Sequence, residues 1–284
     1  MARTDRPLQR PARPSRPAVS AAVFAIVSLL APPPAHASPP DLAAALRGHR
    51  VFNRYCISCH GVEGDGRGPT AAWVDPRPRA LTSGVFKFRS TPSGTLPTDE
   101  DLLRTVDDGL GHTSMPRWSP LSLHERRDVV QYVKSLSPRF ATEPSGTPIA
   151  IPPRPALTPA LATRGQAVWV RMQCATCHGD AGRGDGPSAP TLRDDWGQPS
   201  PPRDFTTGPL KVGEAPEDLY RAFLTGLNGS AMPSYAEAGL TPDDAWALVA
   251  YVRSLRSERR RHAPSRGRKR AVRPSRRCPG EGLG

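Results

Sequence analysis

The sequence predicts an all-α protein built from two tandem copies of one small domain, joined by a Pro-rich linker. A block of about ninety residues occurs twice, with small gaps. Each copy contains segments in which apolar residues recur at helical spacing. The stretch between the copies is rich in proline and has no helical period, so we expect it to be extended and semi-rigid.

The two copies match at positions spread along their whole length. The first match pairs Arg47-Gly48 with Arg164-Gly165, and the last pairs Tyr132-Val133 with Tyr251-Val252. The matches between them, in order, are Cys56 and Cys174, the Gly-rich runs 64–69 and 182–187, Pro78-Arg79 and Pro202-Arg203, Asp101 and Asp218, and Met115-Pro116 and Met232-Pro233. Such a series indicates a duplicated domain.

Each copy is expected to contain an opening, a middle and a closing helix. Ser122 and Glu125 have the spacing of a capping box, which marks the start of one closing helix. The remaining residues of each copy form Gly/Pro-rich loops. The expected helices cover 42–58, 99–108 and 122–136 in the first copy, and 160–176, 216–225 and 241–255 in the second.

These elements divide the chain into five parts. The boundaries follow the repeat, the proline content and the charge. The parts are a signal peptide at 1–37, a first domain at 41–137, a Pro-rich linker at 138–158, a second domain at 159–256 and a basic disordered tail at 257–284.

The N-terminus has the features of a secretory signal. Basic residues precede an apolar run from Ala18 to Ala31, and Ala35-His36-Ala37 forms an A-x-A cleavage site. The run has 14 residues, which is too short to span a membrane comfortably. We therefore expect export to the periplasm, with an uncleaved membrane anchor as the alternative.

The net charge of +13 belongs to the two ends of the chain. The first 17 residues contribute +4 and the residues from Arg256 onward contribute +9, so the middle is neutral. An exported protein with a neutral middle is not expected to bind nucleic acid. The basic tail is interpreted as a solubilising extension, or as a segment that binds anionic lipid or an acidic redox partner. Cys278, within this tail, has no site around it.

The motif C-x-x-C-H occurs once in each copy, as Cys56-Cys59-His60 and as Cys174-Cys177-His178. This is the attachment signature of c-type haem, in which two thiols on one helical face bind one porphyrin edge. The following histidine supplies a ring nitrogen to the iron. A thioredoxin-like C-x-x-C does not explain the histidines, and half a zinc site would need partner ligands at zinc-finger spacing, which are missing.

With these motifs, downstream methionines and helices at both ends, each copy resembles a class I cytochrome c domain, and the chain resembles a tandem dihaem cytochrome c. The resemblance implies two covalent haems with iron, and Met115 and Met232 as the distal ligands of His60 and His178. The alternative for both methionines is core packing. His112, near Met115, has Gly229 as its counterpart and is expected to be an exposed loop residue.

The resemblance also implies two structural features around each haem. Pro69 and Pro187, nine residues after the histidines, would accept a hydrogen bond from the histidine ring; the alternative is a simple turn. Gly and aromatic pairs on the opening helix would pack against the closing helix. These residues are Gly48 and Phe52 against Val129 and Tyr132, and Gly165 and Trp169 against Leu248 and Tyr251.

The interval between histidine and methionine is about ten residues longer than in the shortest class I domains, and the length lies in loops that carry matched cations. Arg79 and Lys87 in the first copy correspond to Arg203 and Lys211 in the second. These cations either pair with haem propionates or are solvated surface charges.

His/Met ligation leaves no open position on the iron, so the resemblance implies an electron carrier and not an enzyme. We expect the protein to relay electrons between redox proteins of the respiratory chain. It would act alone or as a subunit of an oxidase or reductase complex. The alternative is a dihaem peroxidase with one displaceable methionine ligand.

Overall fold

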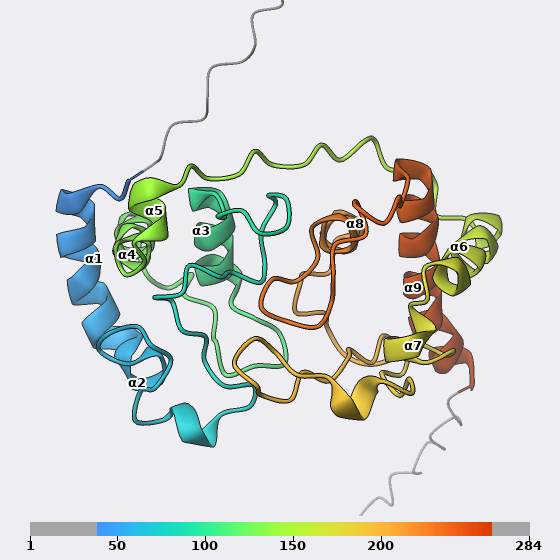
Figure 1. The fold of residues 1–284 in the computed structure, drawn as a ribbon, viewed down its shortest axis with the longest axis horizontal. Coiled ribbons are helices and arrows are strands. Elements are labelled where there is room, and N and C mark those ends of the chain that lie inside the picture. The colour runs from blue at the N-terminus through green and yellow to red at the C-terminus, as the bar shows by residue number, and fades with distance from the viewer. Residues whose placement is uncertain (1–38, 263–284) are drawn as a thin grey trace, which may run out of the picture. The chain divides into compact units, whose positions relative to one another are not determined.

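A computed structural model of the chain describes residues 39–262 and confirms the all-α prediction within that range. Apart from two isolated β-bridges, the described residues form helices and loops (Figure 1). The predicted signal peptide, Cys278 and most of the predicted tail lie outside the described residues.

The helices follow the predicted order in both halves of the chain. The first half contains α1 (Leu42–Tyr55), α2 (Ile57–His60), η1 (Ala71–Trp73), α3 (Asp99–Asp108), α4 (Leu123–Ser135) and α5 (Arg139–Thr142). The second half contains α6 (Pro159–Arg171), α7 (Ala175–His178), η2 (Ala189–Thr191), α8 (Pro216–Thr225) and α9 (Pro242–His262). The short helices η1 and η2 are 3₁₀ turns, and neither they nor α5 were expected from the sequence.

Three predicted helix ends are wrong. The opening helices do not continue into the cysteine motifs, because α1 ends at Tyr55 and α6 ends at Arg171. In the second half Gln173 has φ 55°, a left-handed backbone that a continuous α-helix excludes. At the other end, α9 continues to His262, so 257–262 are helical and not disordered. Residues 257–262 contain no Gly or Pro that would end the helix.

In each half, the opening helix crosses the closing helix at a glycine, as predicted. A Cβ atom on Gly48 would lie 2.0 Å from the carbonyl oxygen of Asp128 in α4. A Cβ atom on Gly165 would lie 1.9 Å from the carbonyl oxygen of Ala247 in α9. Only glycine permits this close backbone approach.

Aromatic rings pack beside both crossings. The rings of Phe52 and Tyr132 have centroids 5.0 Å apart. The rings of Trp169 and Tyr251 lie edge to face at 5.5 Å. Offset and edge-to-face contacts of this kind stabilise a helix pair beyond simple area burial.

The first part of the predicted linker packs onto the first domain. Phe140 of α5 is buried against Phe86, with ring centroids 5.8 Å apart. The backbone amide of Gly146 donates to the carbonyl of Leu96 at 3.0 Å, and that of Ile149 donates to Ser90 at 2.8 Å. The segment 138–158 is therefore extended only after a short helix and a stretch that is bonded to the first domain.

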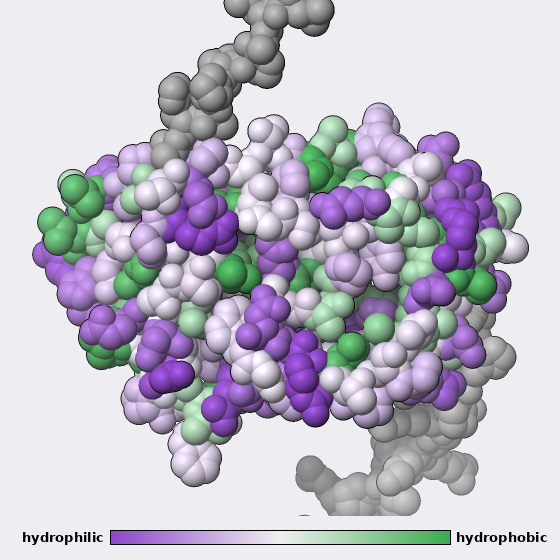
Figure 2. Space-filling view, in the orientation of Figure 1, coloured by the Kyte–Doolittle hydropathy of each residue, from purple (hydrophilic) through white to green (hydrophobic). Residues whose placement is uncertain are grey.

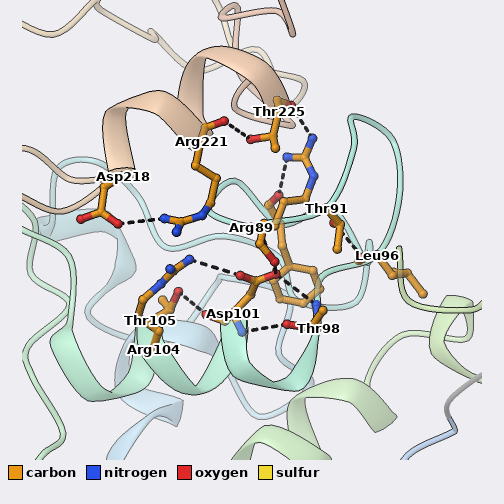
Figure 3. A network of polar contacts seen from close by, with 12 residues as sticks. Arg89, Thr91, Leu96, Thr98, Asp101, Arg104, Thr105, Asp218, Arg221 and Thr225 are labelled. Carbon is orange, nitrogen blue, oxygen red and sulfur yellow. Dashed lines mark hydrogen bonds and ion pairs between the residues drawn. The ribbon is translucent and has the colours of Figure 1, made fainter. Parts of the chain in front are cut away.

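A buried arginine joins the two halves. Arg89 is only 2% exposed, and its Nη2 donates to the carbonyl oxygen of Thr225, at the end of α8, at 2.6 Å. Figure 3 shows this bond beside two matched ion pairs, Asp101 with Arg104 in α3 and Asp218 with Arg221 in α8. Burial lowers the pKa of Arg89 to about 10, so its guanidinium remains charged at neutral pH.

Large apolar side chains that remain exposed are scattered over the described surface. They include Trp73, which is 84% exposed, and Leu42 and Leu46 on α1. On the face drawn in Figure 2, apolar residues form small patches among polar ones. Within residues 39–262, no helix has both the length and the apolar character needed to cross a membrane.

Candidate functional site

The two cysteine motifs adopt the same local structure. Cys56 precedes α2, and the backbone amide of His60 donates to the carbonyl of Cys56 at 2.9 Å. Cys174 precedes α7, and the amide of His178 donates to Cys174 at the same distance. Each motif is thus one helical turn whose first cysteine lies at the helix start, which places the two thiols and the histidine together.

The four motif cysteines form no disulfide with one another. Burial, followed by the neighbouring Cys59, raises the pKa of Cys56 to about 11. Burial is also the largest influence on Cys174, whose pKa rises to about 11. Thiols paired three residues apart have the spacing needed for covalent attachment of a porphyrin edge.

Each motif histidine is fixed by a backbone carbonyl. The Nδ1 atom of His60 lies 3.3 Å from the carbonyl oxygen of Arg79. The Nδ1 atom of His178 lies 3.1 Å from the carbonyl oxygen of Arg203. A donated Nδ1–H bond leaves Nε2 with its lone pair available to a metal, the arrangement typical of ligating histidines.

Burial lowers the pKa of both histidines, while the carbonyl contact acts in the opposite direction. The neutral imidazole is the form that binds a metal. The carbonyls that accept from the histidines are not those of Pro69 and Pro187. The alternative interpretation therefore holds, and these prolines are turn residues. The repeated Pro-Arg pairs were visible in the sequence, but no local signal showed that their loops fold back onto the histidines.

Both candidate methionines lie in short closed loops. The amide of Leu110 donates to the carbonyl of Met115 at 3.1 Å, and that of Leu227 donates to Met232 at 3.0 Å. A hydroxyl accepts from each methionine amide, Thr113 Oγ1 at 3.0 Å and Ser230 Oγ at 3.5 Å. The repeated loop geometry places the two methionines equivalently in the two halves.

One continuous cavity of about 1710 Å³ brings together all eight residues predicted to bind haem. Its volume exceeds the roughly 300–1,000 Å³ of a typical single-ligand pocket. These lining residues are Cys56, Cys59, His60, Met115, Cys174, Cys177, His178 and Met232. The space and the ligand types therefore fit haem, with sulfur and imidazole donors in each half.

The cavity wall carries a concentration of positive charge. Arg79, Lys87, Arg203 and Lys211 all line it. Burial, followed by the charges of Arg79 and Lys211, lowers the pKa of Lys87 to about 8. Burial also lowers the pKa of Lys211, with Arg203 acting in the same direction. Lys87 and Lys211 are therefore not solvated surface charges.

Two buried donors in the cavity wall have no hydrogen-bond partner, the indole Nε1 of Trp118 and Nε of Arg203. Buried donors without partners are costly unless another group accepts from them. Donors and cations in this arrangement suit the carboxylates of a haem.

The two sites differ in the ring packed against the motif histidine. Phe205 stacks on His178, with centroids 4.6 Å apart and planes inclined by 25°. The matching position in the first half is Leu81, which has no ring. The sequence repeat contained this difference, although only the fold shows that position 205 faces the histidine.

Two family models match the chain in tandem. Residues 43–133 match the model described as cytochrome c oxidase, cbb3-type, subunit III, and residues 162–256 match the model described as cytochrome c. The two matches cover the two helical units that surround the cysteine motifs.

Curated relatives and a solved structure are similar over most of the chain. A cytochrome bc1 complex cytochrome c subunit of Corynebacterium diphtheriae is 26% identical over 237 residues, which are 80% of this chain and 70% of that protein. The cbb3-type cytochrome c oxidase subunit CcoP of Azospirillum brasilense is 28% identical over 222 residues, 75% of this chain and 63% of that protein. A chain of a reducing HAO-like protein complex of Kuenenia stuttgartiensis has a TM-score of 0.72 and 42% identity, and the match covers 74% of this chain and 95% of that one.

Proposed function

The chain belongs to the cytochrome c family, with two cytochrome c domains in tandem, and on this premise we propose that it is a periplasmic electron carrier with two covalent haems, each ligated by histidine and methionine. The family and the cytochrome subunits among its relatives establish electron transfer by a multihaem cytochrome as the general function. The number of haems, the distal ligands and the compartment are the proposed details.

The repeated geometry of the two halves supports two equivalent sites. In each half, a cysteine pair would hold a porphyrin edge, and a half-buried neutral histidine, fixed by an arginine carbonyl, would offer Nε2 to the iron. The thioether sulfur of Met115 or Met232 would complete the ligand set. A bound c-type haem supplies a one-electron iron couple, and thioether ligation raises its potential.

The single observation that carries the methionine assignment is the closed loop that occurs in both halves. In both halves the methionine ends a Leu-to-Met hydrogen-bonded loop and lies on the wall of the cavity that the motif histidines also line, although Met232 packs against the core of the second half as well. Closed six-coordinate sites suit electron transfer and leave no position for a substrate.

We propose redox proteins of respiration as the partners, because two relatives are named as subunits of a bc1 complex and a cbb3-type oxidase. The solved relative is part of a protein complex, which favours a complex subunit over a free carrier. The secretory signal at 1–37 supports the periplasm as the location. An uncleaved signal or the basic tail would supply membrane association.

Replacement of each methionine tests the assignment. Met115→Ala and Met232→Ala should each retain both covalent haems, measured by mass, and each lose about half of the Met–Fe(III) charge-transfer absorption, because each removes one of two distal ligands. The double variant should lose all of it. Met172→Ala is the matched control, since Met172 packs in the core of the second half and is not among the cavity-lining residues.

Unchanged absorption in both single variants would refute the ligation. A haem count of one would refute the two-site proposal. Rapid peroxide turnover by the native holoprotein would favour the peroxidase alternative.

A further inference from the structure

Arg79 has two separate roles in the structure. Its backbone carbonyl accepts from Nδ1 of His60 in its own half. Its side chain reaches into the other half, where Nη1 donates to the carbonyl oxygen of Gly229 at 2.8 Å. The guanidinium also lies over the ring of Trp196, 4.3 Å from the centroid, and 3.6 Å from the carboxylate of Asp194.

Arg203, the counterpart of Arg79, makes the reciprocal connection. Its carbonyl accepts from Nδ1 of His178 in the second half. Its Nη2 lies 3.2 Å from Nε2 of His112 in the first half. The same Nη2 also lies within hydrogen-bonding distance of the carbonyls of Thr207 and Pro209, so its two hydrogens are shared among three acceptors that fix the side chain in this direction.

The two contacted residues occupy the same place in the two methionine loops. Gly229 precedes Met232 by three residues, and His112 precedes Met115 by three residues. Both have left-handed backbones, with φ 73° at Gly229 and φ 55° at His112. His112 is exposed, as predicted, but its contact with Arg203 had no signal in the sequence.

Each loop is short, so a displacement of Gly229 or His112 would also displace the methionine three residues later. The Leu227 to Met232 hydrogen bond closes one loop, and the Leu110 to Met115 bond closes the other. A non-glycine residue in the left-handed region persists only where its surroundings hold it, so contact with Arg203 contributes to the shape of the first loop.

We propose that Arg79 and Arg203 are positioning residues that couple the two haem sites crosswise. Each arginine orients the proximal histidine of its own half through its carbonyl and holds the distal methionine loop of the other half through its guanidinium. The proposal rests on the proposed His/Met ligation. The stability of each methionine–iron bond then depends on a residue of the opposite domain. The two ligation sites are therefore coupled, and each affects the other by the same free energy.

The alternative role, pairing with the propionates of the same half, predicts a different pattern. The Nη1 of Arg79 donates to Gly229, and its planar face covers Trp196, so much of its binding capacity is directed to the second half. If Arg79 served only its own haem, its removal would change the Met115 site and leave the Met232 site unaltered.

Exogenous imidazole provides a test that does not use electron-transfer activity. In the haem-loaded Met115→Ala protein, the remaining Met–Fe(III) absorption belongs to Met232, and imidazole removes it by displacing the methionine. Adding Arg79→Ala should make imidazole displace Met232 at about fivefold lower concentration or less. In the Met232→Ala protein, the same change should leave displacement of Met115 within about twofold. Arg203→Ala should give the opposite pattern.

Two control variants distinguish loss of the contacts between the halves from a general loss of positive charge. Arg50→Ala and Arg183→Ala each remove an exposed cation, one in each half, that does not line the cavity, and both should leave the displacement curves unchanged. Arg79→Lys keeps the charge but loses the planar fork, so it should shift the Met232 curve in the same direction by a smaller factor. It also tests the proposal should Arg79→Ala fail to incorporate haem.

Equal shifts at both sites, or a shift confined to the arginine's own half, would overturn the crosswise coupling alone. Absence of the absorption in the Met115→Ala parent, before any arginine is changed, would overturn the proposed Met232 ligation and the coupling with it.

Discussion

Substitution of Gly165 by alanine decides between two opposing effects. Helix propensity alone favours alanine over glycine by about 1 kcal/mol. In the structure, the new Cβ would lie 1.9 Å from the carbonyl oxygen of Ala247 and 2.6 Å from its carbonyl carbon. Both atoms belong to the backbone of α9, so no rotation of a side chain relieves the contact.

Helix α6 would therefore have to move away from α9. Ordinary contact begins at 3.4 Å, so the helices must separate by about 1.5 Å, which forfeits at least half of the dispersion energy of the facing atoms. Val168 and Trp169, which are buried on the same face, would lose contact with α9. Overpacking typically costs about 1–3 kcal/mol, and the lost packing adds to it.

We expect Gly165→Ala to lower the free energy of unfolding by roughly 2–3 kcal/mol after the gain in helix propensity is subtracted. The corresponding fall in Tm is roughly 4–12 °C. The assay is thermal and denaturant unfolding of the haem-loaded protein followed by helical circular dichroism. Ala167→Gly, at an exposed position two residues along α6, reports the propensity effect alone.

A Tm for Gly165→Ala equal to or above that of the native protein would refute the close-approach argument. It would mean that the helices cross with room for a methyl group and that helix propensity dominates.

Two further predictions concern charged groups. Burial acts to raise the pKa of Asp244, but hydrogen bonds from Arg164 and Arg171 outweigh it and hold that pKa below its usual value. The stabilisation by Asp244 is therefore present above the unfolded pKa and lost as pH falls below about 4. Asp244→Asn should lower the free energy of unfolding by about 1 kcal/mol at pH 7, and the two proteins should become equally stable at low pH. A difference in Tm that stays constant across this pH range would contradict a stabilising ion pair. Arg89→Met leaves the carbonyl of Thr225 without its donor, so we expect the free energy of unfolding, measured in denaturant, to fall by about 1–3 kcal/mol, whereas an unchanged value would show that Arg89 does not stabilise the contact between the halves.

The sequence alone predicted the repeated architecture, which the structure confirms, and it named the residues of the candidate sites, which the structure brings to one cavity. The two C-x-x-C-H motifs, the recurrent Met-Pro pairs and the glycines of the helix crossings are local patterns, and duplication showed each of them twice. The middle helices α3 and α8 have the predicted bounds, because capping residues and Gly109 and Gly226 mark their ends locally. The end of the opening helix within residues 42–58 was not predicted, because nothing in their composition indicates the break at Cys56.

Only the tertiary structure decided which groups act on the ligands. The acceptor for each histidine is an arginine carbonyl 19 or 25 residues away. The carbonyls of Pro69 and Pro187 are nearer in sequence but do not accept this bond. The contacts of Arg79 with Gly229 and of Arg203 with His112 span 150 and 91 residues. A repeat specifies what each half contains. How the halves meet depends on loop conformation and on long-range packing such as that of Arg89, and neither has a periodic signal in the chain.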